Sequence, residues 1–232
     1  MSRDKKDLRE ERKKHRREEN RLSILRAGEE VFARKGYSLT TMDDIAREAQ
    51  FSKATLYSYF RSKNEIFFEI ILNSHEEVIL KLKKIKDKEE SVDEKIKRII
   101  RFILKSLRQK ENISRIFLME KSLLKNVLGV MPPDGHSLEE TERRFLQEIQ
   151  RKRKAMLEII SEIFHQGIVS GEFRDIDSLE AAYILESMVR GFHFTRFWRE
   201  RSYSLNKSTH LIHQFFLYGL KKGLRASQGE KK

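Results

Sequence analysis

The side chains best suited to chemistry lie within residues 41–60, in a short segment with helical spacing. In its second half, Leu56 together with Tyr59 or Phe60 would face inward. The outward face would carry hydrogen-bonding groups with one cation at its N-terminal end: Lys53, Thr55, Tyr57 and Ser58. Such a face suits contacts to nucleic acid, because base edges present hydrogen-bonding groups and a helix N-terminus favours phosphate. An ordinary helical hairpin inside an enzyme or scaffold is the alternative.

Two short helices must hold this face in place, and both need a core supplied by their neighbours. The first has one apolar face, formed by Met42, Ile45, Ala46 and Ala49. Thr41 and Asp44 make a capping-box pair at its start, and Ser52 is the expected N-cap of the second helix. Phe51 would fill the turn between them. The flanking helices would supply the core through Val31, Phe32, Ile66 and Phe67.

The order of residues from 27 to 66 resembles the DNA-binding domain of the tetracycline-repressor (TetR) family of bacterial regulators. The residues that carry the resemblance are Ala27, Phe32, Gly36, Tyr37, Thr40, Thr41, Ile45, Ala46, Ala49, Ser52, Thr55, Leu56, Tyr57, Tyr59, Phe60, Ser62 and Lys63. Two positions depart from the family pattern, since Gln50 and Ala54 stand where glycine is usual. Gln50 weakens the turn if that position requires a positive φ.

The resemblance implies that Ser52, Lys53, Thr55, Tyr57, Tyr59 and Lys63 face DNA. Tyr57 and Lys63 would act mainly through phosphates. Thr40 and Thr41 are also within reach of a backbone phosphate, although Thr41 also serves as the cap. Phosphate contacts fix position and few side chains read bases, so the operator sequence is not deducible.

Composition favours an all-α protein of about nine helices. The chain has 232 residues, 37% of them charged, with 2 prolines, 10 glycines and no cysteine. Its net charge of +13 suits a polyanionic partner. No apolar run is long enough to cross a bilayer and no signal-peptide pattern opens the chain, so a cytoplasmic protein without a membrane partner is expected.

Four regions are expected along the chain. Residues 1–19 form a charged arm, either disordered or partly helical, that touches either DNA or nothing. Residues 20–66 form the helix-turn-helix domain, 67–226 an effector-binding and dimerisation domain, and 227–232 a tail. In the third region, helices are expected to reach about residues 86, 109, 128 and 167, after starts at 62, 91, 112 and 137. The last two would span 178–199 and 207–224.

By resemblance, the last two helices pack against their copies in a second subunit, forming a homodimer through a four-helix bundle. Their apolar surface comprises Ala181, Leu185, Met188, Val189, Phe192, Leu211, Phe215 and Leu217. The alternative is that these residues fill the monomer's own core. Family members also bind a small effector among these helices. The candidate pocket residues are Phe102, Phe117, Phe164, Met188, Phe192, His193, Arg196 and Trp198, with Arg190 and Thr195 as further polar anchors. An apolar or amphipathic ligand such as a long-chain acyl thioester would suit them.

Two rival classes of function remain open. Ser122 and Lys125 match a Ser-x-x-Lys pair, but no partner motif accompanies them, so catalysis is not expected. His210 and His213 share a helix face without a carboxylate at ligand spacing, so neither a metal site nor a cofactor is expected. The second rival is a basic scaffold that binds membrane or RNA. The favoured hypothesis is a regulator, by default a repressor, that binds a pseudo-palindromic operator as a homodimer and is released by its effector.

Overall fold

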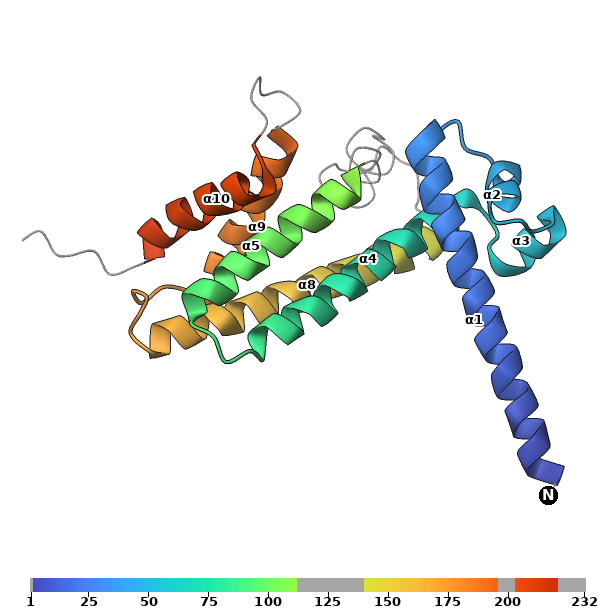
Figure 1. The fold of residues 1–232 in the computed structure, drawn as a ribbon, viewed down its shortest axis with the longest axis horizontal. Helices are drawn as coiled ribbons and strands as arrows, with labels where there is room; N and C mark the ends of the chain where they lie inside the picture. Colours follow the sequence, from blue (N-terminus) through green and yellow to red (C-terminus); the bar gives the residue numbers. More distant parts are fainter. Residues whose placement is uncertain (1, 112–139, 196–202, 221–232) are drawn as a thin grey trace, which may run out of the picture. The chain divides into compact units, whose positions relative to one another are not determined.

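The computed structural model describes residues 2–111, 140–195 and 203–220, and these residues form helices and connecting loops (Figure 1). The helices are α1 (Ser2–Lys35), α2 (Met42–Glu48), α3 (Lys53–Tyr59), α4 (Lys63–Lys86), α5 (Val92–Gln109), α8 (Glu140–Val169), α9 (Ser178–Thr195) and α10 (Leu205–Leu220). The all-α expectation is therefore confirmed. Eight helices lie in the described ranges, whereas the helix expected at 112–128 lies outside them.

The chain divides into two compact units. The first contains residues 1–74 and 112–146, and the second contains residues 75–111 and 147–232. Two long helices, α4 and α8, contribute one part to each unit. The domain boundary expected between residues 66 and 67 stays a prediction.

The first unit is built where α1, α2, α3 and the first turns of α4 share an apolar core. Its buried side chains include Ile24, Val31, Phe32, Ile45, Leu56, Phe60, Ile66 and Phe67, each 0% exposed. Gly28 lets α1 and α4 approach closely, because a Cβ there would lie 2.7 Å from the Ile66 side chain. Phe32 and Phe67 meet edge to face with centroids 5.5 Å apart. The core expected from Val31, Phe32, Ile66 and Phe67 is thereby confirmed.

The N-terminal arm belongs to α1. Residues 2–19 continue the same helix that enters the core at Ile24, so the helical alternative for the arm describes the structure. In Figure 1, α2 and α3 lie beside the C-terminal part of α1, and the N-terminal part extends past them. The first helix therefore begins at Ser2, well before the domain expected to start at residue 20.

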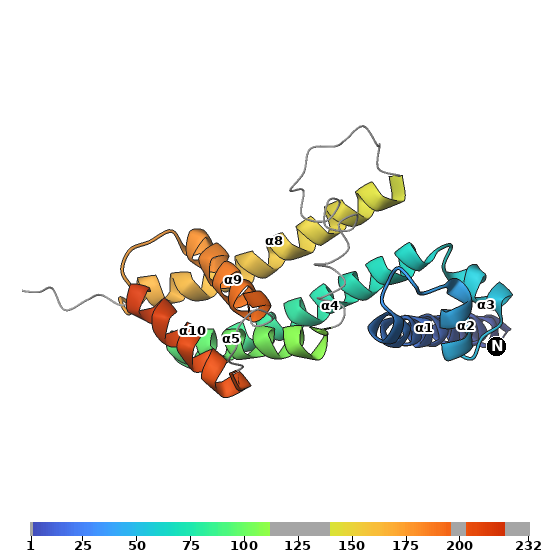
Figure 2. The ribbon, with the colours of Figure 1, turned by 90° about the horizontal axis from the view of Figure 1, so that it is seen from above.

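The second unit has a larger apolar core in which α5 packs against α9 and α10 (Figure 2). Its fully buried members include Ile96, Ile99, Ile163, Phe164, Leu185 and Val189. Ion pairs between Lys86 and Glu162 and between Lys152 and Glu76 join the second half of α4 to α8. No helix in the described ranges is long and apolar enough to span a membrane.

Helix starts follow local capping chemistry. Ser91 accepts the N–H of Glu94 at 3.3 Å and opens α5 as expected. Asp177 caps α9 by accepting the N–H groups of Leu179 and Glu180. The last helix begins at Leu205 because Ser204 accepts the N–H of Lys207 at 3.2 Å, two residues before the expected start.

Candidate nucleic-acid interface

Two buried side chains, one aliphatic and one aromatic, anchor α3 in the core of the first unit. Leu56 and Phe60 are both 0% exposed, which confirms Leu56 and selects Phe60 over Tyr59 as its inward partner. Ser52 caps the helix, because its hydroxyl accepts the N–H of Thr55 at 3.1 Å. The expected N-cap is thus confirmed. A seven-residue helix held this way presents its remaining face at a fixed angle.

The supporting helix α2 begins with the expected capping box. The Thr41 hydroxyl accepts the N–H of Asp44 at 3.2 Å, and the Asp44 carboxylate accepts the N–H of Thr41 at 3.1 Å. Lys35 on α1 donates to the same carboxylate at 2.6 Å. The hydrogen bond from Lys35 and those from Thr41 lower the pKa of Asp44 to about 2. This carboxylate therefore joins the end of α1 to the start of α2.

The turn between α2 and α3 contains the one backbone position in the described ranges where a residue other than glycine has a positive φ. Gln50 has φ 59°, in the left-handed region that favours glycine. The position of Gln50 therefore does have the positive φ at which a glutamine weakens the turn. The neighbouring Phe51 donates its N–H to the Ala46 carbonyl at 2.9 Å and closes the turn.

The outward face of α3 carries the side chains expected there. Ser52, Lys53, Tyr57 and Ser58 are exposed, Tyr57 to 46%, and Thr55 is partly exposed. Lys53 forms an exposed ion pair with Asp43 at 2.8 Å, which raises the pKa of the lysine. Exposed pairs of this kind contribute little stability, so a phosphate can replace Asp43 at small cost.

Tyr59 lies at the edge of this face and is partly buried. Its hydroxyl accepts a hydrogen bond from the Asn20 side-chain amide at 3.0 Å. The Arg17 guanidinium lies 5.8 Å from the ring centroid, and Arg21 lies 4.9 Å from the ring centroid of Phe60. Arg21 also pairs with Glu69 at 2.6 Å. Sequence reasoning missed these α1 contacts with the C-terminal end of α3 because each joins residues far apart in the sequence.

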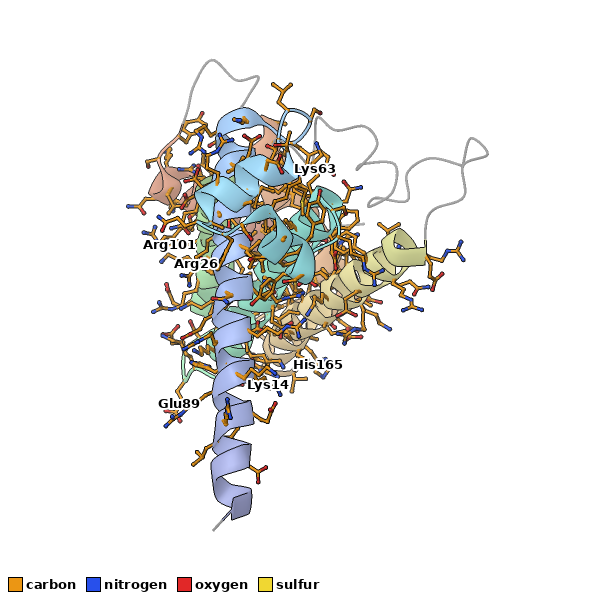
Figure 3. All side chains as sticks on the ribbon, turned by 90° about the vertical axis from the view of Figure 1, so that its right-hand side faces the viewer. Lys14, Arg26, Lys63, Glu89, Arg101 and His165 are labelled. Carbon is orange, nitrogen blue, oxygen red and sulfur yellow. The ribbon has the colours of Figure 1, made fainter. Side chains whose placement is uncertain are left out.

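Two expected DNA contacts have other partners in this structure. Thr40 is 1% exposed, and its hydroxyl donates to the Gly36 carbonyl at 2.6 Å, so its side chain is closed to a phosphate. The Lys63 ammonium, labelled in Figure 3, donates to the carbonyls of Tyr37, Ser38 and Thr40 at 2.9, 3.1 and 2.9 Å. These bonds use all three ammonium donors. In this structure both side chains bind the loop before α2, and the DNA contacts expected of them stay predictions.

The residues expected to line an effector pocket lie in or against the core of the second unit where they are described. Phe164 is 0% exposed and contacts Phe173 and Phe216, with centroids 6.4 and 5.4 Å away. His193 is 1% exposed, and its ring lies edge-on to Phe194. Phe102, Met188 and Phe192 are partly buried against the same core. Phe117, Arg196 and Trp198 lie outside the described residues, so this pocket stays a prediction.

A charge cluster around the buried Glu186 in the second unit was missed from the sequence, apart from Arg190. Glu186 is 4% exposed and accepts from Arg153 at 2.7 Å and from Arg190 at 2.9 Å. Burial is the largest influence on this carboxyl and raises its pKa, but the two guanidinium groups together lower the pKa below its ordinary value. The i,i+4 spacing of Glu186 and Arg190 was the available sequence signal. Within the described ranges, no three His, Asp or Glu side chains gather as a metal site would require.

Comparison with known proteins agrees with this geometry. Residues 24–70 match the model of the bacterial regulatory proteins of the tetR family. The uncharacterized HTH-type transcriptional regulator YfiR of Bacillus subtilis is 41% identical over 71 residues, 31% of this chain and 35% of that protein. The uncharacterized HTH-type transcriptional regulator YhgD of the same organism is 26% identical over 187 residues, 80% of this chain and 87% of that protein.

A solved structure extends the likeness beyond the first unit. The transcriptional regulator FadR from Bacillus subtilis, in complex with stearoyl-CoA, has a TM-score of 0.67 at 21% identity and covers 85% of this chain and 98% of its own. That likeness shows a common fold across both units. The matched residues 24–70 contain the whole of α2 and α3 with their caps, so this part of the chain is a helix-turn-helix domain of the type found in the tetR family of bacterial regulatory proteins.

Proposed function

We propose that this regulator is a ligand-responsive repressor that binds a pseudo-palindromic operator through α3. The observation that carries the proposal is the exposed polar face of α3, held by the fully buried Leu56 and Phe60. The DNA-facing set is Thr41, Ser52, Lys53, Thr55, Tyr57 and Tyr59, with Thr40 and Lys63 positioning the preceding loop. Such a protein acts where the chromosome is, in the cytoplasm, and by binding instead of catalysis.

A homodimer through α9 and α10 is supported by apolar side chains that the chain's own core leaves exposed. Ile184 on α9 is 55% exposed, and Phe215 and Tyr218 on α10 are 72% and 82% exposed. Four of the surface residues expected from sequence, Ala181, Leu185, Val189 and Leu217, instead fill the monomer core. The monomer core therefore uses one face of these helices, and the proposed dimer would use the face that stays exposed. Replacing Phe215 and Tyr218 with glutamate should yield a monomer in sedimentation, whereas an unchanged dimer would contradict this interface.

The effector would enter the second unit near Phe102, Met188 and Phe192, which are the partly buried members of the expected set. A long-chain acyl thioester is the ligand class we propose, and the stearoyl-CoA complex of the FadR regulator, a protein of the same fold, supports it. The ligand can release DNA only if it binds one conformation better than the other. Native mass spectrometry of the purified chain with stearoyl-CoA tests this class, and the absence of a bound species would contradict it.

The DNA-binding proposal is tested with the full chain and a pool of random duplexes. Selection by binding should yield an operator with two half-sites, protected from cleavage one helical turn apart. Tyr57→Ala should lower operator affinity at least tenfold with an unchanged melting temperature, because Tyr57 is exposed and is not one of the buried core residues. Gln150→Ala, at an exposed position of α8 in the second unit, is the control. Equal affinity for every duplex, or full binding by Tyr57→Ala, would overturn the assignment.

A further inference from the structure

The N-terminal arm carries a basic surface on the same face of α1 as the residues that this helix buries in the core. Counting back from the buried Val31, Ala27 and Ile24 at three- and four-residue steps leads to Asn20, Arg16, Lys13 and Arg9. These positions share one face of α1. Where the helix passes beyond the core, the apolar residues of that face give way to cations, and residues 7–19 are all exposed. We call Arg9, Arg12, Lys13, Arg16 and Arg17 the basic stripe.

Three of the five acidic residues in 7–19 lie opposite this stripe, whereas Glu10 and Glu19 flank it. Asp7, Glu11 and Glu18 recur at four- and seven-residue spacing, two residues out of step with Arg9, Lys13 and Arg16. Two residues correspond to roughly 200° around a helix, so these three acids occupy the opposite side. Like charges at i,i+3 and i,i+4 destabilise a free helix by about 0.2–0.5 kcal/mol per pair. The repulsion within the stripe therefore lowers the stability of the free helix, and a bound polyanion would offset that repulsion.

The stripe begins at the end of α3. Asn20, the last position before the core on this face, donates to the Tyr59 hydroxyl at 3.0 Å. Arg17 places its guanidinium 5.8 Å from the centroid of the same ring. Figure 3 shows α1 continuing past α2 and α3, with Lys14 labelled on the continuing part. A duplex seated on α3 would thus meet the basic stripe next to Tyr59.

We propose that the basic stripe contacts phosphates of the same duplex that α3 reads, outside the groove that α3 occupies. From Arg9 to Arg17 the helix rises about 12 Å, which matches roughly three to four base-pair steps. The arm thereby lengthens each half-site by sequence-independent contacts, which raise affinity and salt dependence without reading bases. This inference depends on the proposed DNA binding by α3.

The test neutralises four stripe residues together, as Arg9→Gln, Arg12→Gln, Lys13→Gln and Arg16→Gln, and leaves Arg17 on Tyr59. Glutamine is a good helix former, so helicity should persist by circular dichroism. The control removes the same charge from exposed lysines of the second unit: Lys81, Lys83, Lys84 and Lys105. The probes are a 40-base-pair duplex of random sequence and the operator obtained by selection.

The stripe variant should bind both duplexes at least tenfold more weakly at low salt. The slope of log affinity against log salt should fall by about 0.9 for each lost phosphate contact, and the operator footprint should shorten at its outer edges. The second-unit control should match the wild type in all three. In single variants, Arg16→Gln should weaken binding more than Lys14→Gln, which removes a charge two residues away on the other side.

Two different failures separate the hypotheses. If the wild type binds no duplex, the proposed DNA-binding function fails. If the wild type binds but the stripe variant keeps its slope and footprint, the arm inference alone is overturned. The inference is equally overturned if the variant loses binding only to single-stranded RNA or to vesicles of anionic lipid, which would assign the stripe to another polyanion.

Discussion

Gln50 gives the sharpest test of the backbone geometry in the DNA-binding unit, because glycine should be better there. Its φ of 59° lies in the left-handed region, where an L residue with a Cβ costs about 1–2 kcal/mol. Glycine removes that cost but adds about 0.5–1 kcal/mol of backbone entropy to the unfolded chain. Gln50→Gly should therefore stabilise the protein by roughly 0.5–1 kcal/mol, or about 1–4 °C in melting temperature for a chain of this size.

The matched control places the same substitution in a helix. Gln150 is exposed on α8, and Gln150→Gly should cost about 1 kcal/mol through helix propensity. Both variants are compared with the wild type by thermal and urea denaturation, followed by circular dichroism. Opposite signs are expected. If Gln50→Gly lowers the melting temperature as Gln150→Gly does, the turn does not carry the strain inferred from its φ. A loss of operator affinity in a stabilised Gln50→Gly variant would assign Gln50 to DNA.

Three further predictions follow from named contacts. Lys63→Met removes three hydrogen bonds to loop carbonyls and should lower the free energy of unfolding by about 1–2 kcal/mol. Operator affinity should fall while the slope of log affinity against log salt stays the same, whereas a slope lower by about 0.9 would show a phosphate contact instead. Gly167→Ala would place a Cβ 2.5 Å from the buried Phe173 ring and should cost about 1–3 kcal/mol in urea denaturation, with partial rescue by Phe173→Leu as a check on the cause. Because the folded pKa of Asp44 is about 2 against an ordinary 3.8, its contribution to stability is complete above about pH 5 and is lost as the pH falls through 3.8 toward 2. The stability gap between wild type and Asp44→Asn should shrink over that range, and a constant gap would exclude this linkage.

The helix-turn-helix could be predicted from the sequence because its local signals agree with one another. Thr41, Ser52 and Ser91 each open a helix through a side-chain hydrogen bond to a residue three positions later, and each such pair is visible in the sequence. The inward side of α3 followed from spacing alone. Even the uncertain position, Gln50, was marked by the absence of the glycine that a left-handed turn favours.

The partners of Lys63 and Thr40 could not be predicted, because they depend on distances between elements far apart in sequence. The sequence shows a lysine at the start of α4 but not that the loop after Tyr37 turns three carbonyls toward it. Likewise, spacing shows that Leu185 and Ile184 are apolar, but only packing shows that the first is buried and the second 55% exposed. Local rules assign elements, and tertiary contacts decide which polar and apolar groups remain available.

The arm can be disordered under some conditions and helical under others, which are the two alternatives considered from sequence. Residues 2–19 have no apolar stripe, since Leu8 stands alone, so they could not start a helix by themselves, where nucleation is unfavourable. The part of α1 around Val31 is already helical because it packs in the core, so no new nucleus is needed. Extending that helix through residues rich in lysine, arginine and glutamate then has only a small free-energy cost. The like-charged pairs of the basic stripe oppose that extension, and phosphates would remove the opposition. Helicity of the free arm should therefore be marginal and should increase when duplex DNA is added, with a smaller increase in the stripe variant. An amide hydrogen-exchange measurement over residues 7–19 distinguishes this from a rigid arm, whose protection would be the same with and without DNA.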